Sequence, residues 1–228
     1  METFTKVGSG PPLIVVDGAF CYRGFGPSAA LADALSGRFT VTTYDRRGRG
    51  GSPGPAPSLA EEIADLKALG TGAAPVLVGI SSGGALALHA VAQGMPAAKL
   101  VLYEPPFVAG LDFAALRREL EAVASPSGKV RFFLRRVMGV PALFTLFVSR
   151  KMKAVAHTLP VDLALMADTS VLSARLQTPA LVVAGEKSPK LLRDAVERVA
   201  AALPHGQARS IAGATHDVPT ARLAELCS

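Results

Sequence analysis

This chain of 228 residues has no tryptophan, few histidines and only two cysteines, Cys21 and Cys227. Two cysteines are too few for a disulfide framework, so we expect reduced thiols. No basic-then-apolar segment follows Met1, which argues against a secretory signal and favours a cytoplasmic protein. Apolar residues make up 50% of the chain, yet no uncharged apolar run reaches the roughly 18 residues of a membrane span. We therefore expect one core and no membrane-spanning helix.

The net charge of +6 comes without a long basic block. Basic residues fall in scattered pairs such as Arg46-Arg47, Arg117-Arg118 and Arg135-Arg136. This scatter is typical of a solvated surface and argues against a nucleic-acid partner. The chain also lacks a metal-ligand cluster and a phosphate-binding loop, so we expect neither a metal nor a cofactor. The oligomeric state is not indicated.

Short apolar runs alternate with helix-forming stretches along most of the chain. Strands are expected at residues 13–16, 39–44, 76–80, 99–103, 180–184 and 207–211. Helices are expected at residues 28–35, 58–69, after 81, and at 188–203 and 220–226, and a capping box opens the second of these. Such alternation predicts an α/β fold in one domain over residues 1–228, with a mostly parallel sheet covered by helices on both faces.

Residues 107–175 break this alternation, because no clear strand appears there. Helical spacing is found around residues 113–123 and 131–137, and two longer stretches follow at 142–155 and 161–172. The segment is rich in phenylalanine and methionine. We expect a small helical lid inserted in the domain.

The central motif is Gly79-Ile80-Ser81-Ser82-Gly83, between an apolar run and an Ala/Leu-rich stretch. A strand–turn–helix with this pattern lifts its middle side chain clear of the sheet, and the flanking glycines avoid clashes. A serine hydroxyl needs a base to become a nucleophile. His216, on the loop after the last expected strand, is the candidate base.

Five segments, taken in order, resemble the α/β-hydrolase superfamily. The first four are Asp17-Gly18-Ala19, the loop Asp45 to Ser52, the Ser81 turn and the strand end Leu102-Tyr103-Glu104-Pro105. The fifth lies near the end of the chain and combines the strand Pro179–Gly185 with the loop Gly213-Ala214-Thr215-His216. The resemblance implies a nucleophile at Ser81, a base at His216, and an oxyanion hole formed by the backbone N–H groups of Ala19 and Ser82.

The sequence departs from the family pattern in two places. Only about a dozen residues precede the strand that ends at Asp17, which predicts a sheet shortened by its first strand. The usual position of the acid holds Ser188, which cannot ionise and is expected to cap the helix beginning at Pro189. Glu104 is our preferred acid, since some members carry it at that strand end; Glu186 and Asp217 have less favourable positions, and a Ser–His dyad is the remaining option.

The resemblance favours a serine hydrolase that cleaves an ester, thioester or similar acyl bond of a small lipophilic substrate through an acyl-enzyme. The residues expected to line the substrate site are Phe20, Cys21, Phe107, Phe144 and Met166. Two alternatives stay open: a non-catalytic ligand-binding protein, and C–C bond hydrolysis or perhydrolysis in the same pocket.

Overall fold

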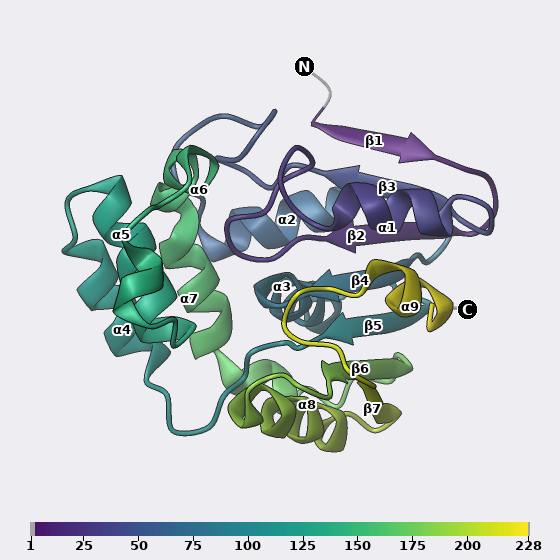
Figure 1. Cartoon of the computed structure of the whole chain (residues 1–228). Coiled ribbons are helices and arrows are strands. Elements are labelled where there is room, and N and C mark those ends of the chain that lie inside the picture. Colours follow the sequence, from purple (N-terminus) through teal and green to yellow (C-terminus); the bar gives the residue numbers. More distant parts are fainter. Residues whose placement is uncertain (1–2, 228) are drawn as a thin grey trace.

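Seven strands form one sheet in the computed structural model, which describes residues 3–227 (Figure 1). The strands are β1 (Phe4–Val7), β2 (Pro12–Val16), β3 (Thr40–Tyr44), β4 (Val76–Ile80), β5 (Lys99–Tyr103), β6 (Ala180–Gly185) and β7 (Gly206–Ile211). Their order is β1-β3-β2-β4-β5-β6-β7, and only β1 runs antiparallel to its neighbour. The predicted mostly parallel sheet is confirmed. Strand β1 was not expected, because its mostly exposed residues lack an apolar run.

Five helices cover the two faces of the sheet. They are α1 (Ser28–Leu35), α2 (Leu59–Leu69), α3 (Ser82–Ala92), α8 (Lys190–Ala202) and α9 (Thr220–Glu225). Side chains alternate along each strand, so Leu13 and Val15 pack with α1 and α9, whereas Ile14 and Val16 pack with α2, α3 and α8. Both faces are therefore buried, as a continuous apolar run predicts. The predicted capping box of α2 is also present.

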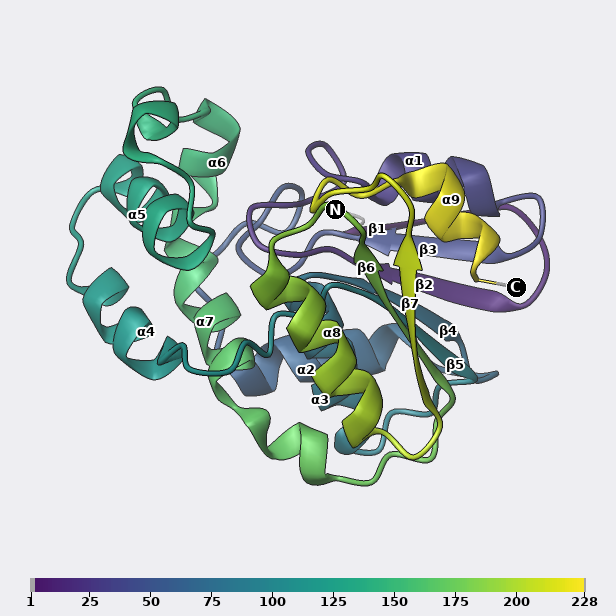
Figure 2. The same ribbon diagram turned by 60° about the horizontal axis from the view of Figure 1, so that its bottom comes forward.

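Residues 107–175, here called the helical segment, lie beside the carboxyl ends of the parallel strands (Figures 1 and 2). The helical segment contains α4 (Phe113–Glu121), α5 (Pro126–Phe132), η1 (Phe133–Val137), η2 (Ala142–Thr145), α6 (Arg150–Ala154), η3 (Ala156–Thr158), α7 (Leu159–Ala167) and η4 (Thr169–Ser173). It has its own apolar cluster, into which Phe20 inserts from the β2 loop. The rings of Phe20 and Phe133 meet edge to face at 5.2 Å.

Two predictions within the helical segment are wrong in detail. The stretch 142–155 is not one helix, because the short turn η2 ends before Ser149, which caps the separate helix α6. The helix predicted at 161–172 ends at Ala167, where the Asp168 side chain caps the next turn, η4. In both places a capping side chain interrupts the apolar pattern. Within residues 3–227, no helix is long and apolar enough to cross a bilayer.

Candidate active site

Ser81 occupies a sharp turn between β4 and α3, with a φ of 51°. Non-glycine residues rarely adopt this left-handed conformation. The turn requires glycine on both sides: a Cβ on Gly79 would lie 2.5 Å from Gly84 Cα, and one on Gly83 would lie 2.1 Å from the Val16 carbonyl oxygen. The sequence pattern therefore reflects packing, and the packing holds the Ser81 side chain at the carboxyl end of the sheet.

His216 follows β7 and reaches the end of β5, where Glu104 lies. His216 Nδ1 is 2.6 Å from Glu104 Oε2, and the carboxyl group is fully buried. An ionised carboxylate can only accept a hydrogen bond, so Nδ1 carries the proton and Nε2 is left as the basic nitrogen. This is the arrangement that a general base requires.

Several donors hold Glu104 in its charged form. Burial alone would raise the pKa of Glu104, but the hydrogen bond with His216, the nearby Ser188 hydroxyl and the Gly185 N–H, 2.7 Å from Oε1, together lower this pKa below its usual value. Glu104 itself has a φ of 48°, a strained conformation that turns its side chain back toward β6 and the His216 loop.

Ser188 does not cap α8, contrary to the sequence-based expectation. Helix α8 begins at Lys190, and its N-cap position, Pro189, offers no side-chain acceptor. The Ser188 side chain instead turns inward, is buried, and lies beside the Glu104 carboxyl group. Residue 188 thus lies next to Glu104, the hydrogen-bond partner of His216, although the serine there carries no charge.

The loop that presents His216 is tied to the sheet on both sides. The Tyr103 hydroxyl donates to the Thr215 carbonyl, and the Lys187 N–H donates to the Ala214 carbonyl at 2.8 Å. The His216 side chain is 33% exposed. Among the described residues no hydrogen bond joins Ser81 to His216; such contacts are often long in unliganded enzymes and tighten when substrate binds.

Two backbone segments meet beside Ser81. A Cβ on Gly18 would lie 3.1 Å from Ser81 Cβ, so the loop carrying Ala19 packs directly against the turn. Ser82 is the first residue of α3, where backbone N–H groups have no partner within the helix. The helix dipole also favours negative charge there.

A buried ion cluster supports this region from the side of the helical segment. Asp162 of α7 accepts hydrogen bonds from Ser82 Oγ and Arg46 Nη1, both at 2.8 Å, and from Arg49 Nη2 at 2.7 Å. Burial alone would raise the pKa of Asp162, but Arg49 and Arg46 hold this pKa below its usual value. Arg49 also donates to the Gly18 carbonyl at 2.7 Å.

Sequence reasoning missed Asp162, because its partners lie 80 or more positions away. The signal available in the sequence was the loop from Asp45 to Ser52, because its arginine side chains need buried acidic partners if they enter the core. Asp45, at the start of that loop, binds Arg23 outside it and the Gly51 N–H within it.

Asp17 directly follows β2 and is buried, and among residues 3–227 it forms no salt bridge. Neither of its carboxyl oxygens has a hydrogen-bond partner of ordinary geometry among the described residues. Burial raises the pKa of Asp17 to about 6, although the nearby Ser28 hydroxyl and the cations of Arg49 and Arg46 oppose this rise. Asp17 is thus close to half-protonated near pH 6.

A cavity of about 600 Å³ lies between the sheet and the helical segment and contains both Ser81 and His216 in its wall. Predicted residues Ala19, Phe20, Cys21, Ser82 and Met166 also line it. Further lining residues, not among those predicted to line the substrate site, are mainly apolar: Phe133, Val137, Met138, Val140, Leu191, Leu192 and Val218. The wall is therefore mainly apolar and has a few polar groups, as in most small-molecule sites.

Phe107 and Phe144 do not line this cavity, contrary to expectation. Phe107 is buried beside His89 on the side of the core that α3 covers. Phe144 is 74% exposed, on the outer side of the helical segment. An apolar residue count cannot tell which face of a short helical turn is inward.

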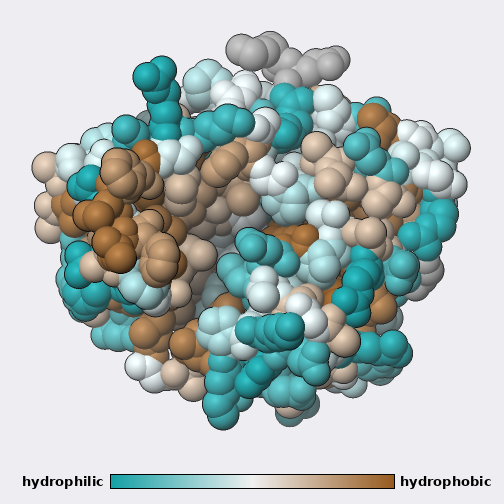
Figure 3. All heavy atoms as spheres, viewed as in Figure 1, coloured by the Kyte–Doolittle hydropathy of each residue, from teal (hydrophilic) through white to brown (hydrophobic). Residues whose placement is uncertain are grey.

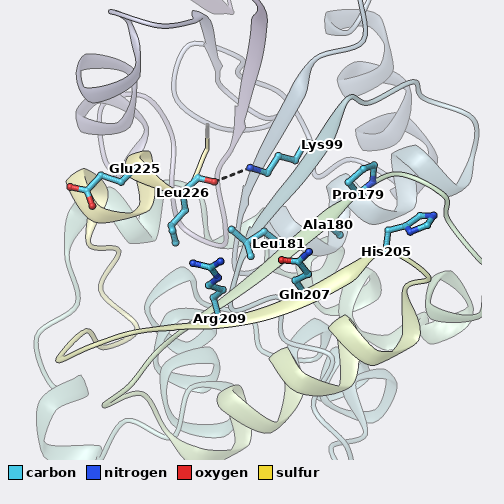
Figure 4. A pocket seen from close by; sticks show the side chains of 9 residues that line it. All are labelled: Lys99, Pro179, Ala180, Leu181, His205, Gln207, Arg209, Glu225 and Leu226. Atoms are coloured by element: carbon cyan, nitrogen blue, oxygen red, sulfur yellow. Dashed lines mark hydrogen bonds between the residues drawn. The ribbon is translucent and has the colours of Figure 1, made fainter.

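A second hollow, of about 340 Å³, lies at the opposite end of the sheet (Figure 4). It is lined by the first residues of β5, β6 and β7 and by α9, and Lys99 donates there to the Leu226 carbonyl at 3.0 Å. Ligands of open parallel sheets bind at the carboxyl ends of strands. The Ser81 cavity is therefore the candidate active site. Within residues 3–227, no group of three or more histidine, cysteine, aspartate or glutamate side chains could hold a metal ion.

Comparison with known proteins agrees with this architecture. The family model described as the alpha/beta hydrolase family matches residues 10–227. The pimeloyl-[acyl-carrier protein] methyl ester esterase of Chromobacterium violaceum is 30% identical over 205 residues, which cover 82% of this chain and 80% of that one. The enzyme of the same name from Xanthomonas oryzae pv. oryzae is 27% identical over 229 residues, covering 92% and 89%.

Among solved structures, an alpha/beta hydrolase from Sphaerobacter thermophilus shares 33% sequence identity with a TM-score of 0.85, over 98% of this chain and 93% of that one. A thermophilic esterase from Thermogutta terrifontis shares the fold, at 24% identity and a TM-score of 0.72, over 98% and 89%. The chain therefore belongs to the alpha/beta hydrolase family and is an esterase-like hydrolase.

Proposed function

We propose that the protein hydrolyses the ester or thioester of a small apolar acyl group through a covalent acyl-enzyme. Ser81 Oγ attacks the carbonyl carbon while His216 Nε2 takes its proton and returns it to the leaving group. Water, activated by His216, then releases the acid and restores Ser81. The observation that carries the proposal is the placement of Ser81 and a carboxylate-bound His216 in one apolar cavity.

Glu104 is the proposed third member of the triad. It would fix the His216 ring in the tautomer with a free Nε2 and stabilise the imidazolium that forms during attack. The non-catalytic alternative draws on the missing carboxylate at position 188 and on the shortened first part of the sheet. Glu104 Oε2, 2.6 Å from His216 Nδ1, supplies a carboxylate to the imidazole and supports catalysis against the first of these grounds.

The backbone N–H groups of Ala19 and Ser82 are the proposed oxyanion hole. The close approach of the Ala19 loop to Ser81 and the position of Ser82 at a helix start support this role. Arg49, which holds the Gly18 carbonyl, and Asp162, which holds the Ser82 hydroxyl, would keep the two amides in register.

An apolar acyl chain fits the cavity wall better than a charged one. The relatives named above act, by their name, on a methyl ester of a pimeloyl group, and a small alcohol leaving group is part of our proposal. We also propose that the helical segment acts as a lid within a single domain, since α7 and η1 supply wall residues of the cavity. The free thiols of Cys21 and Cys227 suit a cytoplasmic location.

A panel of methyl and p-nitrophenyl esters with acetyl to decanoyl chains tests this proposal. We expect kcat/KM to rise by up to about fourfold for each methylene that the cavity buries. In Ser81→Ala the turnover should fall by roughly 10⁴ or more. Ser36→Ala, after α1 and away from the cavity, is the matched control and should keep wild-type rates. Turnover that survives in Ser81→Ala would contradict the proposal.

A further inference from the structure

We propose that residues 141–153, here called the tip, dock the protein on a bilayer that contains anionic phospholipids. The tip includes η2, the loop after it and all of α6 except its last residue, Ala154. This binding surface is separate from the proposed chemistry, because none of its residues lines the Ser81 cavity.

The tip carries the most exposed large apolar side chains of the described residues. Their exposed fractions are 71% for Leu143, 74% for Phe144, 56% for Leu146 and 96% for Phe147. The space-filling view shows hydrophobic side chains gathered over this part of the molecule, at the left of Figure 3. Single exposed apolar residues are ordinary, but four within five positions indicate a contact surface.

The exposed side chains belong to one short stretch of backbone. Leu143 and Phe144 are part of the 3₁₀ turn η2, and Leu146 and Phe147 directly follow it. Thr145, between the two pairs, is buried. A short turn with exposed apolar side chains before and after a buried residue suits a fluid acyl layer, which can surround it, better than one flat protein face.

Several backbone carbonyl groups of the tip already have hydrogen-bond partners within the protein. Arg131 donates to the Thr145 carbonyl at 3.3 Å and to the Leu146 carbonyl at 3.5 Å, and the Thr145 hydroxyl donates to the Ala142 carbonyl at 2.8 Å. Carbonyl groups without partners are costly in a bilayer. The turn can therefore enter the acyl boundary without leaving these carbonyls unpaired.

Positive charge surrounds the tip. Residues 122–161 contain no aspartate or glutamate and have seven basic side chains: Lys129, Arg131, Arg135, Arg136, Arg150, Lys151 and Lys153. This stretch carries +7, whereas the whole chain carries +6, so the remaining residues together carry −1. One of the seven cations, Arg136, is paired with Glu119 of α4 at 3.0 Å. Apolar side chains next to clustered cations are typical of proteins that bind anionic membrane surfaces.

These charges also distinguish between the possible binding partners of the tip. A second copy of the chain would place like charges against each other across a symmetric contact. An acidic protein would match the cations but would have to enclose a short turn with four exposed apolar side chains. An anionic bilayer matches both features. Met138, which is exposed and lines the cavity, precedes the tip, so docking would bring the cavity mouth near the bilayer.

Vesicle sedimentation tests the proposal on the full chain. We expect binding to vesicles of equal parts phosphatidylcholine and phosphatidylglycerol at low salt, and weak binding to phosphatidylcholine alone. The variant Phe144→Ser/Phe147→Ser should bind the anionic vesicles about tenfold or more weakly, since two apolar contacts are lost. Val7→Ser on β1, also an exposed apolar residue, is the matched control and should bind as wild type does.

The variant Arg135→Gln/Arg150→Gln tests how much positive charge contributes to vesicle binding. It should weaken vesicle binding several-fold at low salt and by less at high salt. All variants should keep the wild-type unfolding midpoint and the wild-type rate on a soluble acetyl ester. Ser81→Ala should bind vesicles as wild type does, so a failure of the proposed catalysis leaves this result unchanged.

Three results would overturn the proposal. The first is no binding to anionic vesicles by the folded wild type. The second is a wild-type dimer that becomes a monomer in Phe144→Ser/Phe147→Ser, which would assign the tip to a second copy. The third is binding to poly-glutamate as tight as to the vesicles and unaffected by loss of the two phenylalanines, which would show that charge alone acts.

Discussion

The hydroxyl of Ser82 donates a 2.8 Å hydrogen bond to Asp162, which lies 80 positions later in the chain. Ser82 is adjacent to the proposed nucleophile, whereas Asp162 belongs to α7 of the helical segment. This contact therefore connects the helical segment to the turn that holds Ser81. Arg46 and Arg49 complete the link, since both also bind Asp162.

Asp162→Asn tests the strength of this link. The substitution leaves two buried guanidinium groups without their shared carboxylate, and we expect the free energy of unfolding to fall by about 3–5 kcal/mol. Chemical denaturation measures the change. Asp65→Asn is the matched control, because it removes the exposed partner of Arg47 and should leave the midpoint almost unchanged. Equal effects of the two substitutions would show that the cluster contributes no more than a surface pair.

Glu104→Gln tests the role of the carboxylate. The amide keeps the shape of the side chain but favours the wrong His216 tautomer, so kcat should fall by roughly 10²–10⁴ while folding is retained. Steady-state kinetics on a p-nitrophenyl ester measures this loss. Glu186→Gln is the control, since the Glu186 side chain accepts from the Gly213 N–H of the same loop. A similar loss in both variants would remove Glu104 from the mechanism.

Asp17→Asn should stabilise the protein at neutral pH. Burial raises the pKa of Asp17 from 3.8 to about 6, so the folded state binds a proton more tightly than the unfolded state. The ionised carboxylate therefore costs stability as pH rises from about 4 to 6, and the full cost is present at pH 7. Two pKa units correspond to about 3 kcal/mol, which is the largest gain expected at pH 7.

The pH dependence provides the control for Asp17. At pH 4 the Asp17 carboxyl group of the folded wild type is already protonated. The increase in the free energy of unfolding from Asp17→Asn should therefore be small at that pH. Asp33→Asn, on the exposed side of α1, should be neutral at both pH values. A gain for Asp17→Asn that does not change with pH would contradict the raised pKa.

Val137→Trp tests whether the cavity holds the acyl chain. Val137 lines the cavity from η1, and the larger ring would fill part of its volume. We expect kcat/KM for an octanoyl ester to fall about tenfold or more, with the acetyl ester changed by less than about threefold. Phe144→Trp, on the outer side of the helical segment, should change neither. Equal losses on both esters would place the acyl chain elsewhere.

Local patterns predicted the elements that local forces determine. The strand β4, the glycines around Ser81 and the capping box of α2 follow from residues next to one another in the chain. Several carboxylates could accept a hydrogen bond from His216, because the sequence does not determine which side chain a long loop reaches. That His216 meets Glu104 depends on the backbone turn at Glu104 and on the hydrogen bond between Tyr103 and Thr215.

Features that depend on distant contacts were missed or misplaced. Asp162 gave no local signal, since its three partners come from two other regions of the chain. Phe107 and Phe144 are both apolar, but only tertiary packing decides that one enters the core and the other faces outward. The neighbouring Pro189 predicts a helix cap at Ser188, whereas burial next to Glu104 turns the Ser188 side chain inward.

The most direct measurement of the central claim is the mass and site of a covalent adduct. The protein is incubated with a fluorophosphonate probe, and intact mass spectrometry is followed by peptide mapping. The account predicts one adduct per chain, located at Ser81, absent in Ser81→Ala and formed much more slowly in His216→Ala, with the Ser36→Ala control labelled as wild type. Labelling of Ser81→Ala to the wild-type extent, or an adduct mapped to another residue, would contradict it.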